Sequence, residues 1–279
     1  MKRRLTALAL ALGLTVTLTA CGGTSNAPAG NSETPGASTE TPTGGEGGTL
    51  KIGYTLFEPM NYIGEDGQLT GFETDFATAV CEKLGLEPEF VEINWDAKIM
   101  ELDSKNIDCI WNGMTITPEL EEALSISDPY IKNYQVVVIR AADLEKYSTT
   151  ESLAGVNLEA EAGSAGEKAI QEDEFLSQAS YTSVVKQTAA LLEVKTGAAD
   201  AAVMDYVLAN ALVGQGDYSD LAMIPELELS VEEYGIGLRK EDTELTQKVN
   251  EAMQALIEDG TLNELAVEYG LEAQLLANQ

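Results

Sequence analysis

Residues 107 to 128 read IDCIWNGMTITPELEEALSISD. A short apolar run leads into an Asn-Gly pair, two threonines and a proline, and an acidic segment follows. Such a run is typical of a buried strand, and Thr-Pro ahead of ELEEAL is typical of a helix start. Polar groups at a corner where a strand gives way to a helix are often placed there to hold a ligand.

The same pattern occurs a second time, in the other half of the chain. In residues 104 to 113 (SKNIDCIWNG) an aspartate opens an apolar strand that ends at Asn112. In residues 197 to 206 (GAADAAVMDY) another aspartate opens a strand that ends at Asp205. Ligands of open α/β sheets bind beyond the carboxyl ends of parallel strands. Two such ends therefore predict two lobes that face a shared cleft.

The rest of the chain alternates in the same way. Residues 71 to 85 (GFETDFATAVCEKLG) predict a helix, because apolar residues recur four apart from Phe72 and Gly85 is a helix stop. We predict further helices at 95–106, 118–125, 164–173, 186–197, 206–215, 242–260 and 261–270, and strands at 49–56, 88–94, 107–115, 134–140, 156–163, 179–184, 199–205, 221–227 and 233–240. This alternation predicts an α/β fold of parallel sheets covered by helices on both faces.

The chain begins with an export signal. Residues 1 to 20 have three cations, an apolar stretch too short to span a membrane and then small residues. The signal ends at LTACG, which resembles the bacterial lipobox, so Cys21 is expected to carry acyl chains such as palmitate and to anchor the protein to the cell membrane. Residues 21 to 49 are rich in Gly, Ser, Thr, Pro and Glu and predict a disordered tether.

Composition excludes several classes of function. Without the signal's three cations, 13 of the 16 basic side chains remain against 47 acidic ones, a net charge of −34. Such a surface argues against nucleic-acid partners. The chain has no histidine, which removes Ser-His-Asp and Cys-His nucleophiles and the usual zinc sites, and no metal or cofactor is expected. Cys81 and Cys109 are either buried apolar residues or a disulfide, and the sequence leaves both open.

Several motifs together resemble the polar amino-acid-binding proteins of ATP-binding-cassette importers. These are GFETDF, IDCIWNGMTIT, SDPY, EAGSAGEKAI, ADAAVMD and EYGIGLRK, which occur in the family's order between about residues 50 and 270. The resemblance implies a two-lobed periplasmic-binding-protein-like fold, with two crossing hinge strands and one small ligand between the lobes. It implies lobe 1 at 50–136 plus 235–279, lobe 2 at 137–234, and hinges at 135–139 and 232–235.

The resemblance also implies binding roles. Aromatic walls are expected at Phe57 and Trp95, contacts with the ligand's amino group at Asn112, Gly113 and Asp205, and contacts with its carboxylate at Thr115, Ser164 and Ala165. Taken singly, these residues have plainer interpretations. The two aromatic residues could be core, and Asp205 and Ser164 could be helix N-caps.

The chain departs from the family at two positions. Most relatives read Thr-Pro-Glu-Arg at the first corner, with the arginine on the ligand's carboxylate, whereas this chain has Leu120 after Glu119. Glu161 stands where several relatives have a polar or basic residue. Lys98 is the nearest candidate for a substitute cation, although we favour its interpretation as a solvated helix residue.

We therefore predict a membrane-tethered, monomeric and extracytoplasmic solute-binding protein. It would capture an amino-acid-like ligand and deliver it to the permease subunits of an importer. An extracytoplasmic sensor and a cyclohexadienyl-dehydratase-like enzyme are the alternatives, and the enzyme is the less favoured because the arginine is missing.

Overall fold

The computed structural model describes residues 48 to 279. The predicted signal, Cys21 and nearly all of the predicted tether lie outside the described residues and stay predictions. Within the described part, no helix is both long enough and apolar enough to cross a membrane, and no cluster of side chains suited to a metal ion is found.

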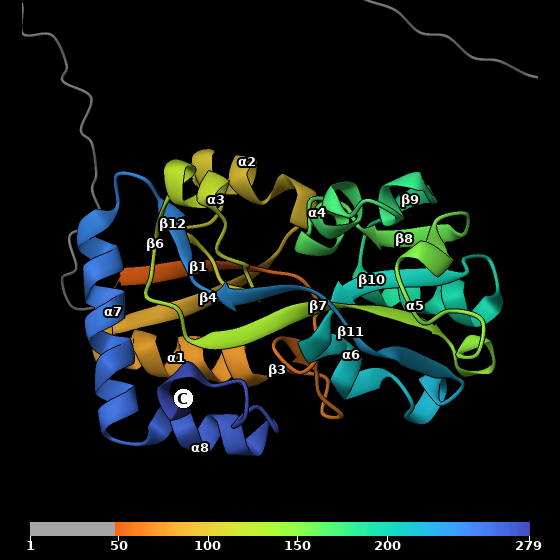
Figure 1. The fold of residues 1–279 in the computed structure, drawn as a ribbon. Helices are drawn as coiled ribbons and strands as arrows, with labels where there is room; N and C mark the ends of the chain where they lie inside the picture. Colours follow the sequence, from red (N-terminus) through yellow and green to blue (C-terminus); the bar gives the residue numbers. More distant parts are fainter. Residues whose placement is uncertain (1–47) are drawn as a thin grey trace, which may run out of the picture. The chain divides into compact units, whose positions relative to one another are not determined.

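The first lobe is built on a five-stranded sheet with the order β4-β1-β5-β12-β6. β1 runs parallel to β4 and β5, whereas β12 runs antiparallel to β5 and β6. The strands are β1 (Gly48–Tyr54), β4 (Leu86–Glu92), β5 (Cys109–Ile110), β6 (Leu124–Ile126) and β12 (Gly237–Arg239), with a small hairpin of β2 (Tyr62–Ile63) and β3 (Leu69–Thr70). Figure 1 shows α1 (Phe72–Leu84) and α8 (Thr261–Glu268) on one side of the sheet, α2 (Lys98–Asp103) and α3 (Pro118–Ala123) on the other, and α7 (Thr243–Glu258) at its end.

The second lobe has a five-stranded sheet with the order β11-β7-β10-β8-β9. β8 runs parallel to β9 and β10, whereas β7 runs antiparallel to β10 and β11. The strands are β7 (Ile131–Arg140), β8 (Asn157–Glu161), β9 (Ser180–Val184), β10 (Ala201–Asp205) and β11 (Leu221–Tyr234). The helices are α4 (Ala165–Glu172), which packs on one face, and α5 (Gln187–Thr196) and α6 (Tyr206–Leu212), which pack on the other.

β7 and β11 connect the two lobes. They pair antiparallel from Ile131 opposite Tyr234 to Arg140 opposite Leu221. Their first-lobe ends are tied to that lobe, because Ile131 bridges Leu275 and Tyr234 lies opposite Thr115. The predicted hinges lie in these strands, and hinge motion there stays a prediction.

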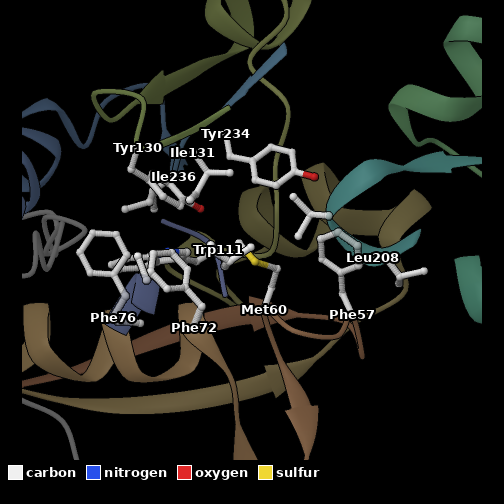
Figure 2. Packing of buried hydrophobic residues seen from close by; sticks show 14 of the residues in the cluster. Phe57, Met60, Phe72, Phe76, Trp111, Tyr130, Ile131, Leu208, Tyr234 and Ile236 are labelled. Carbon is white, nitrogen blue, oxygen red and sulfur yellow. The ribbon is translucent and has the colours of Figure 1, made fainter. Parts of the chain in front are cut away.

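Alternation along the strands divides the core into layers. Val136 and Val138 of β7 belong to the largest cluster, whereas Val137 and Ile139 belong to a second cluster on the opposite face of the sheet. Figure 2 shows the aromatic part of the largest cluster, where the rings of Phe76 and Trp111 meet edge to face with centroids 5.2 Å apart. A third, smaller cluster lies beneath α2 and α3.

The two cysteines are part of this core. Cys81 on α1 and Cys109 on β5 are both buried free thiols. Burial raises the pKa of both, that of Cys81 to about 12. In the structure they therefore act as small apolar residues rather than as a disulfide.

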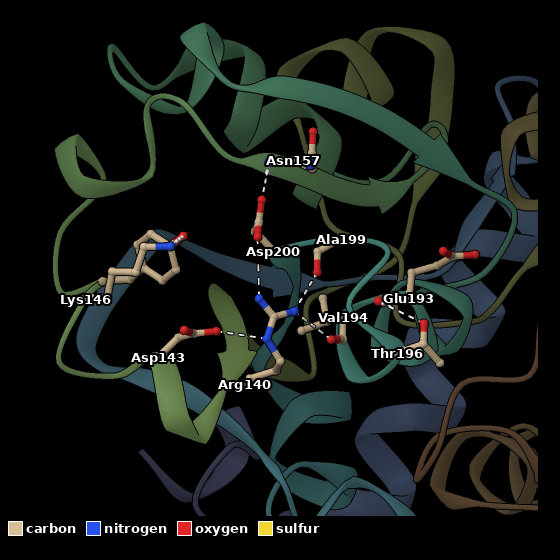
Figure 3. Close-up of polar contacts among 10 residues, drawn as sticks. Arg140, Asp143, Lys146, Asn157, Glu193, Val194, Thr196, Ala199 and Asp200 are labelled. Atoms are coloured by element: carbon tan, nitrogen blue, oxygen red, sulfur yellow. Dashed lines mark hydrogen bonds and ion pairs between the residues drawn. The ribbon is translucent and has the colours of Figure 1, made fainter.

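A partly exposed network of ion pairs and hydrogen bonds fixes the Arg140 end of β7 (Figure 3). The guanidinium of Arg140 contacts Asp143 at 2.9 Å and Asp200 at 3.5 Å, and its Nη1 donates to the carbonyl oxygens of Val194 and Ala199. The strand, the end of α5 and the start of β10 are thus joined at one side chain. This network is remote from the strand ends that form the site.

The two-lobed α/β fold is as predicted, but several details differ, among them the following. Each sheet is mixed, because β12 in one lobe and β7 in the other enter antiparallel to the parallel strands. The predicted strand at 107–115 is regular only at Cys109–Ile110, and β6 lies where a helix end was predicted. Leu124 and Ile126 pair with β12, a partner more than a hundred residues away, so local pattern could not show it.

Candidate ligand-binding site

A cavity of about 440 Å³ lies where the strand ends of the two lobes meet. The first lobe contributes the end of β1, the loop after β5 and the starts of α2 and α3. The second lobe contributes the ends of β8 and β10 and the start of α4. The structure brings all eight predicted ligand-binding residues together in its lining: Phe57, Trp95, Asn112, Gly113, Thr115, Ser164, Ala165 and Asp205. Whether they bind a ligand stays a prediction.

Two aromatic side chains form apolar walls. Phe57 and Trp95 are buried to 5% and 7% exposure and both line the cavity. Phe57 packs directly on Gly113, where a Cβ would lie 2.5 Å from Cε1 of the ring. Gly113 also has φ +56°, so both the close contact and the backbone conformation require glycine.

The amide of Asn112 is committed to its own lobe. Its Oδ1 accepts from Thr55 Oγ1 at 2.7 Å, and its Nδ2 donates to the carbonyl of Thr55 at 2.9 Å and to Asn61 Oδ1 at 2.8 Å. These bonds use both amide hydrogens and one of the two lone pairs of Oδ1. Asn112 therefore has no side-chain donor left for a ligand, which could contact only the remaining lone pair of Oδ1 and the backbone.

Gly113 is held by an acid that the sequence analysis did not single out. Glu73, on α1 and fully buried, accepts the N–H of Gly113 at 2.9 Å on each carboxylate oxygen and also the hydroxyl of Tyr130. Burial raises the pKa of Glu73 to about 7, against the lowering effect of these donors. The sequence feature that pointed to Glu73 is the position of an acid directly beside the apolar residue Phe72 in GFETDF.

Thr115 is also bonded internally. Its hydroxyl donates to Glu232 on β11, and Ser230 donates to the same carboxylate at 3.1 Å. Burial, followed by the charge of Asp205, raises the pKa of Glu232 to about 7. While Glu232 is ionised, the Thr115 hydroxyl can accept a hydrogen bond from a ligand but has no proton left for a carboxylate.

Asp205 lies at the end of β10 and is 5% exposed. Four side chains donate to it: Asn133 at 2.6 Å, Gln135 at 2.9 Å, Tyr234 at 2.8 Å, and Gln187. Burial nevertheless raises the pKa of Asp205. Three of the donors share Oδ1, which leaves Oδ2 with one donor and room for another.

The helix-cap interpretation of Asp205 is not realised. Its side chain makes no capping hydrogen bond to α6. Asn133 takes that role instead, accepting the N–H of Val207 at 3.3 Å. Ser164, by contrast, is both a cap and a cavity residue, because its Oγ accepts the N–H of Glu167 at 3.2 Å.

Lys98 is not the solvated helix residue that we favoured. It is 8% exposed, lines the cavity and reaches across to the other lobe, where Nζ donates to the carbonyl of Gly163 at 2.9 Å. Nζ also donates to the carbonyl of Trp95 at 3.3 Å and lies 4.6 Å from the centroid of its ring. Burial lowers its pKa, opposed by Glu161, Asp96 and Glu167. The interpretation was wrong because α2 begins at the cleft, which the sequence does not reveal.

The lining is acidic overall. It includes five carboxyl side chains and two lysines: Glu119, Glu161, Glu167, Glu172 and Asp205, with Lys98 and Lys168. Leu120, in place of the family's arginine, also lines the cavity. The structure therefore offers one buried cation, Lys98, for an anionic group of a ligand.

This arrangement of two α/β lobes around a cavity at their strand ends defines the periplasmic-binding-protein type of fold. Residues 50–272 match the family model described as bacterial extracellular solute-binding proteins, family 3, and the chain belongs to that family.

Individual relatives are similar over most of their length. The L-cystine-binding protein TcyJ of Escherichia coli is 28% identical over 222 residues, which are 79% of this chain and 82% of the relative. The structure of an ancestral arginine-binding protein bound to arginine has a TM-score of 0.75 at 31% identity, covering 80% of this chain and 98% of that one.

One similar structure bears on the enzyme alternative. It is the ancestral amino acid-binding protein AncCDT-1, described as a precursor of cyclohexadienyl dehydratase, with a TM-score of 0.72 at 31% identity, covering 80% of this chain and 95% of that one. A protein with this fold is thus described as the precursor of an enzyme, whereas the L-cystine relative is named as a binding protein.

Proposed function

We propose that this protein captures a small amino-acid-like ligand in the cavity and delivers it to the permease subunits of an ATP-binding-cassette importer. The observation that carries the proposal is the pairing of a buried cation, Lys98, with buried acids inside one cavity. A zwitterionic ligand needs both signs of charge close together once water is excluded.

Each end of the ligand has a partner in this proposal. The α-ammonium binds Oδ2 of Asp205, which has the spare acceptor capacity. The α-carboxylate binds Lys98, whose ammonium has a third hydrogen after its two carbonyl bonds, and the free first-turn amides of α4. Phe57 and Trp95 exclude water from both contacts.

A thermal-shift screen followed by calorimetry tests the proposal. Amino acids, amines and short peptides are screened against residues 48 to 279. A ligand at about 100 times its Kd stabilises the folded protein by about 2.7 kcal/mol. If no amino acid raises the unfolding temperature, and calorimetry detects no heat of binding, the proposal is wrong.

Catalysis is the competing function, and the raised pKa of Glu161, to about 8, is the observation in its favour. A carboxyl group that titrates near neutral pH could transfer a proton. Nuclear magnetic resonance of the ligand after prolonged incubation separates the two. We expect the ligand to be recovered unchanged, whereas a dehydrated product would identify an enzyme.

We further propose that lipid on Cys21 tethers a monomer to the outer side of the cell membrane. The support is the lipobox-like sequence at residues 18 to 22 and the extracytoplasmic family. Cell fractionation of wild type and Cys21→Ala tests the anchor, because the variant should leave the membrane fraction. A permease-deletion strain separates import from sensing. Uptake of labelled ligand should be lost in that strain if the protein serves import, whereas a response to the ligand would persist if the protein were a sensor.

We also propose that residues 50–136 with 235–279 and residues 137–234 move as two bodies about β7 and β11. The support is that these two strands make the connection between the sheets. Small-angle scattering should show compaction when ligand is added. An unchanged radius of gyration at saturation would contradict the motion.

A further inference from the structure

Glu161 is the last residue of β8, at the carboxyl end of a strand that is parallel to its neighbours. It is 5% exposed and lines the cavity. Among residues 48 to 279, its carboxylate has no cation within 4.0 Å. The amide of Gln187, which donates to Asp205, also lies near enough to lower the pKa of Glu161, so the polar group beside this acid is neutral. A buried carboxylate in that situation is costly unless a ligand compensates it.

The other acids of the lining have partners. Asp205 has its four donors, and Glu119 pairs with Lys168 at 2.8 Å. Glu172 lies 3.9 Å from the same lysine. Glu167 accepts the N–H of Gly163 at 2.7 Å and the hydroxyl of Tyr181 at 2.9 Å. Glu161 therefore stands out within the described lining as the acid that has neither an ion pair nor a set of several hydrogen-bond donors.

The charges around Glu161 come from three elements. Asp205 on β10 repels its negative charge, whereas Lys98 on α2 and Lys186 before α5 attract it without forming an ion pair. Burial is the largest effect, and the resulting pKa is about 8. The two lysines thus only partly offset the rise in the pKa of Glu161 that burial causes.

We propose that Glu161 binds a cationic nitrogen of the ligand other than the α-ammonium, so that the protein selects amino acids with a positively charged side chain, ammonium or guanidinium. This inference rests on the proposed function, in which Asp205 already receives the α-ammonium. The two buried acids of the lining agree with it, since the single ammonium of a zwitterion would be taken by Asp205 and would leave Glu161 without a cation.

Calorimetry with matched ligands tests the proposal. L-Arginine and L-lysine carry the additional charge, whereas L-citrulline and L-norleucine have similar length without it. We expect wild type to prefer the charged member of each pair by about tenfold or more. Glu161→Gln should remove about tenfold or more of the affinity for the charged ligands and less than about threefold for the neutral ones.

Glu172→Gln is the control, because it removes the same charge from an exposed position at the rim of the cavity. It should change every affinity by less than about threefold. Proper folding of Glu161→Gln is checked by thermal unfolding, since loss of a buried carboxylate that lacks a partner should not lower the unfolding temperature.

Proton release provides a second measurement. A cation bound to Glu161 stabilises the carboxylate, so wild type should release protons on binding near neutral pH, as measured in buffers of different ionisation enthalpy. Release by wild type should exceed that by Glu161→Gln for arginine and should be equal in both proteins for citrulline.

Three results would overturn the inference. Equal losses for charged and neutral ligands in Glu161→Gln would assign Glu161 to the ammonium that every amino acid carries. No loss for either would show that it binds no cation, and neutral ligands that bind wild type as tightly as charged ones would contradict the selectivity. All three leave the proposed function standing, whereas the absence of binding by any amino acid removes both.

Discussion

Two of the strand-to-helix corners that face the cavity differ in how their polar groups are used. At the β5–α3 corner of the first lobe, the amide of Asn112, the N–H of Gly113 and the hydroxyl of Thr115 are bonded to other parts of the protein. At the β8–α4 corner of the second lobe, Glu161 forms no ion pair with any residue of the described part, and Lys98 reaches over from the opposite lobe. The first corner is built for rigidity, and the second retains the chemistry that a ligand can use.

The largest effect is expected from Lys98→Met. The variant should weaken binding of a free α-amino acid by about 2 to 5 kcal/mol, because the ligand carboxylate would be buried without its cation. Calorimetry measures this, with Lys168→Met as the control at the rim. An α-carboxamide ligand should be much less sensitive to the variant. Equal losses for acid and amide would show that Lys98 acts through structure instead of charge.

Asn112→Ala should have the opposite profile. It removes bonds to Thr55 and Asn61 in a buried network and should lower the free energy of unfolding by about 1 to 3 kcal/mol. Ligand affinity of the folded protein should change little. Denaturant titration measures the free energy of unfolding, and calorimetry measures the affinity. A large loss of affinity without a loss of stability would show that the Asn112 side chain binds the ligand.

Leu120→Arg should have a moderate effect on ligand affinity. The new guanidinium would return a carboxylate partner to the first corner, since Leu120 lines the cavity. In the Lys98→Met background it should restore about tenfold in affinity for a free α-amino acid, about 1.4 kcal/mol. In the wild-type background the gain should be smaller, because Lys98 already binds the ligand carboxylate. If Leu120→Arg does not restore affinity in the Lys98→Met variant, the ligand carboxylate does not lie near position 120.

The last prediction concerns the pH dependence of stability. Burial raises the pKa of Glu161 from 4.5 to about 8, and those of Glu73 and Glu232 from 4.5 to about 7. These acids hold more protons when folded than when unfolded, so the stability of the ligand-free protein should fall as pH rises from about 5 to about 8. Unfolding temperatures measured across that window test this.

The same experiment on Glu161→Gln isolates one acid. Its decline should be shallower than that of wild type, chiefly in the upper part of the window, because Glu161 has the highest of the three values. An unfolding temperature that rises between pH 5 and pH 8 would contradict the raised pKa values of all three acids.

The fold class, the two lobes and most of the strand positions can be read from the sequence. These follow from local periodicity, and polar residues such as Asn112 and Asp205 appear just where the apolar runs stop. The alternation of helices with strands was therefore predictable for most of residues 49 to 270, but not for the short strands β2, β3 and β6. Family likeness then placed all eight candidate binding residues, which the structure brings into one lining.

Which polar groups remain available to a ligand depends instead on contacts that form only in the folded protein. Asn112 is satisfied by Thr55, 57 residues away, and Asp205 by Asn133, 72 residues away. Lys98 meets Gly163 across 65 residues, and no local pattern records that contact. Hydrogen bonding and burial depend on which atoms meet after folding, so the isolation of Glu161 and the reach of Lys98 could not be read from the sequence.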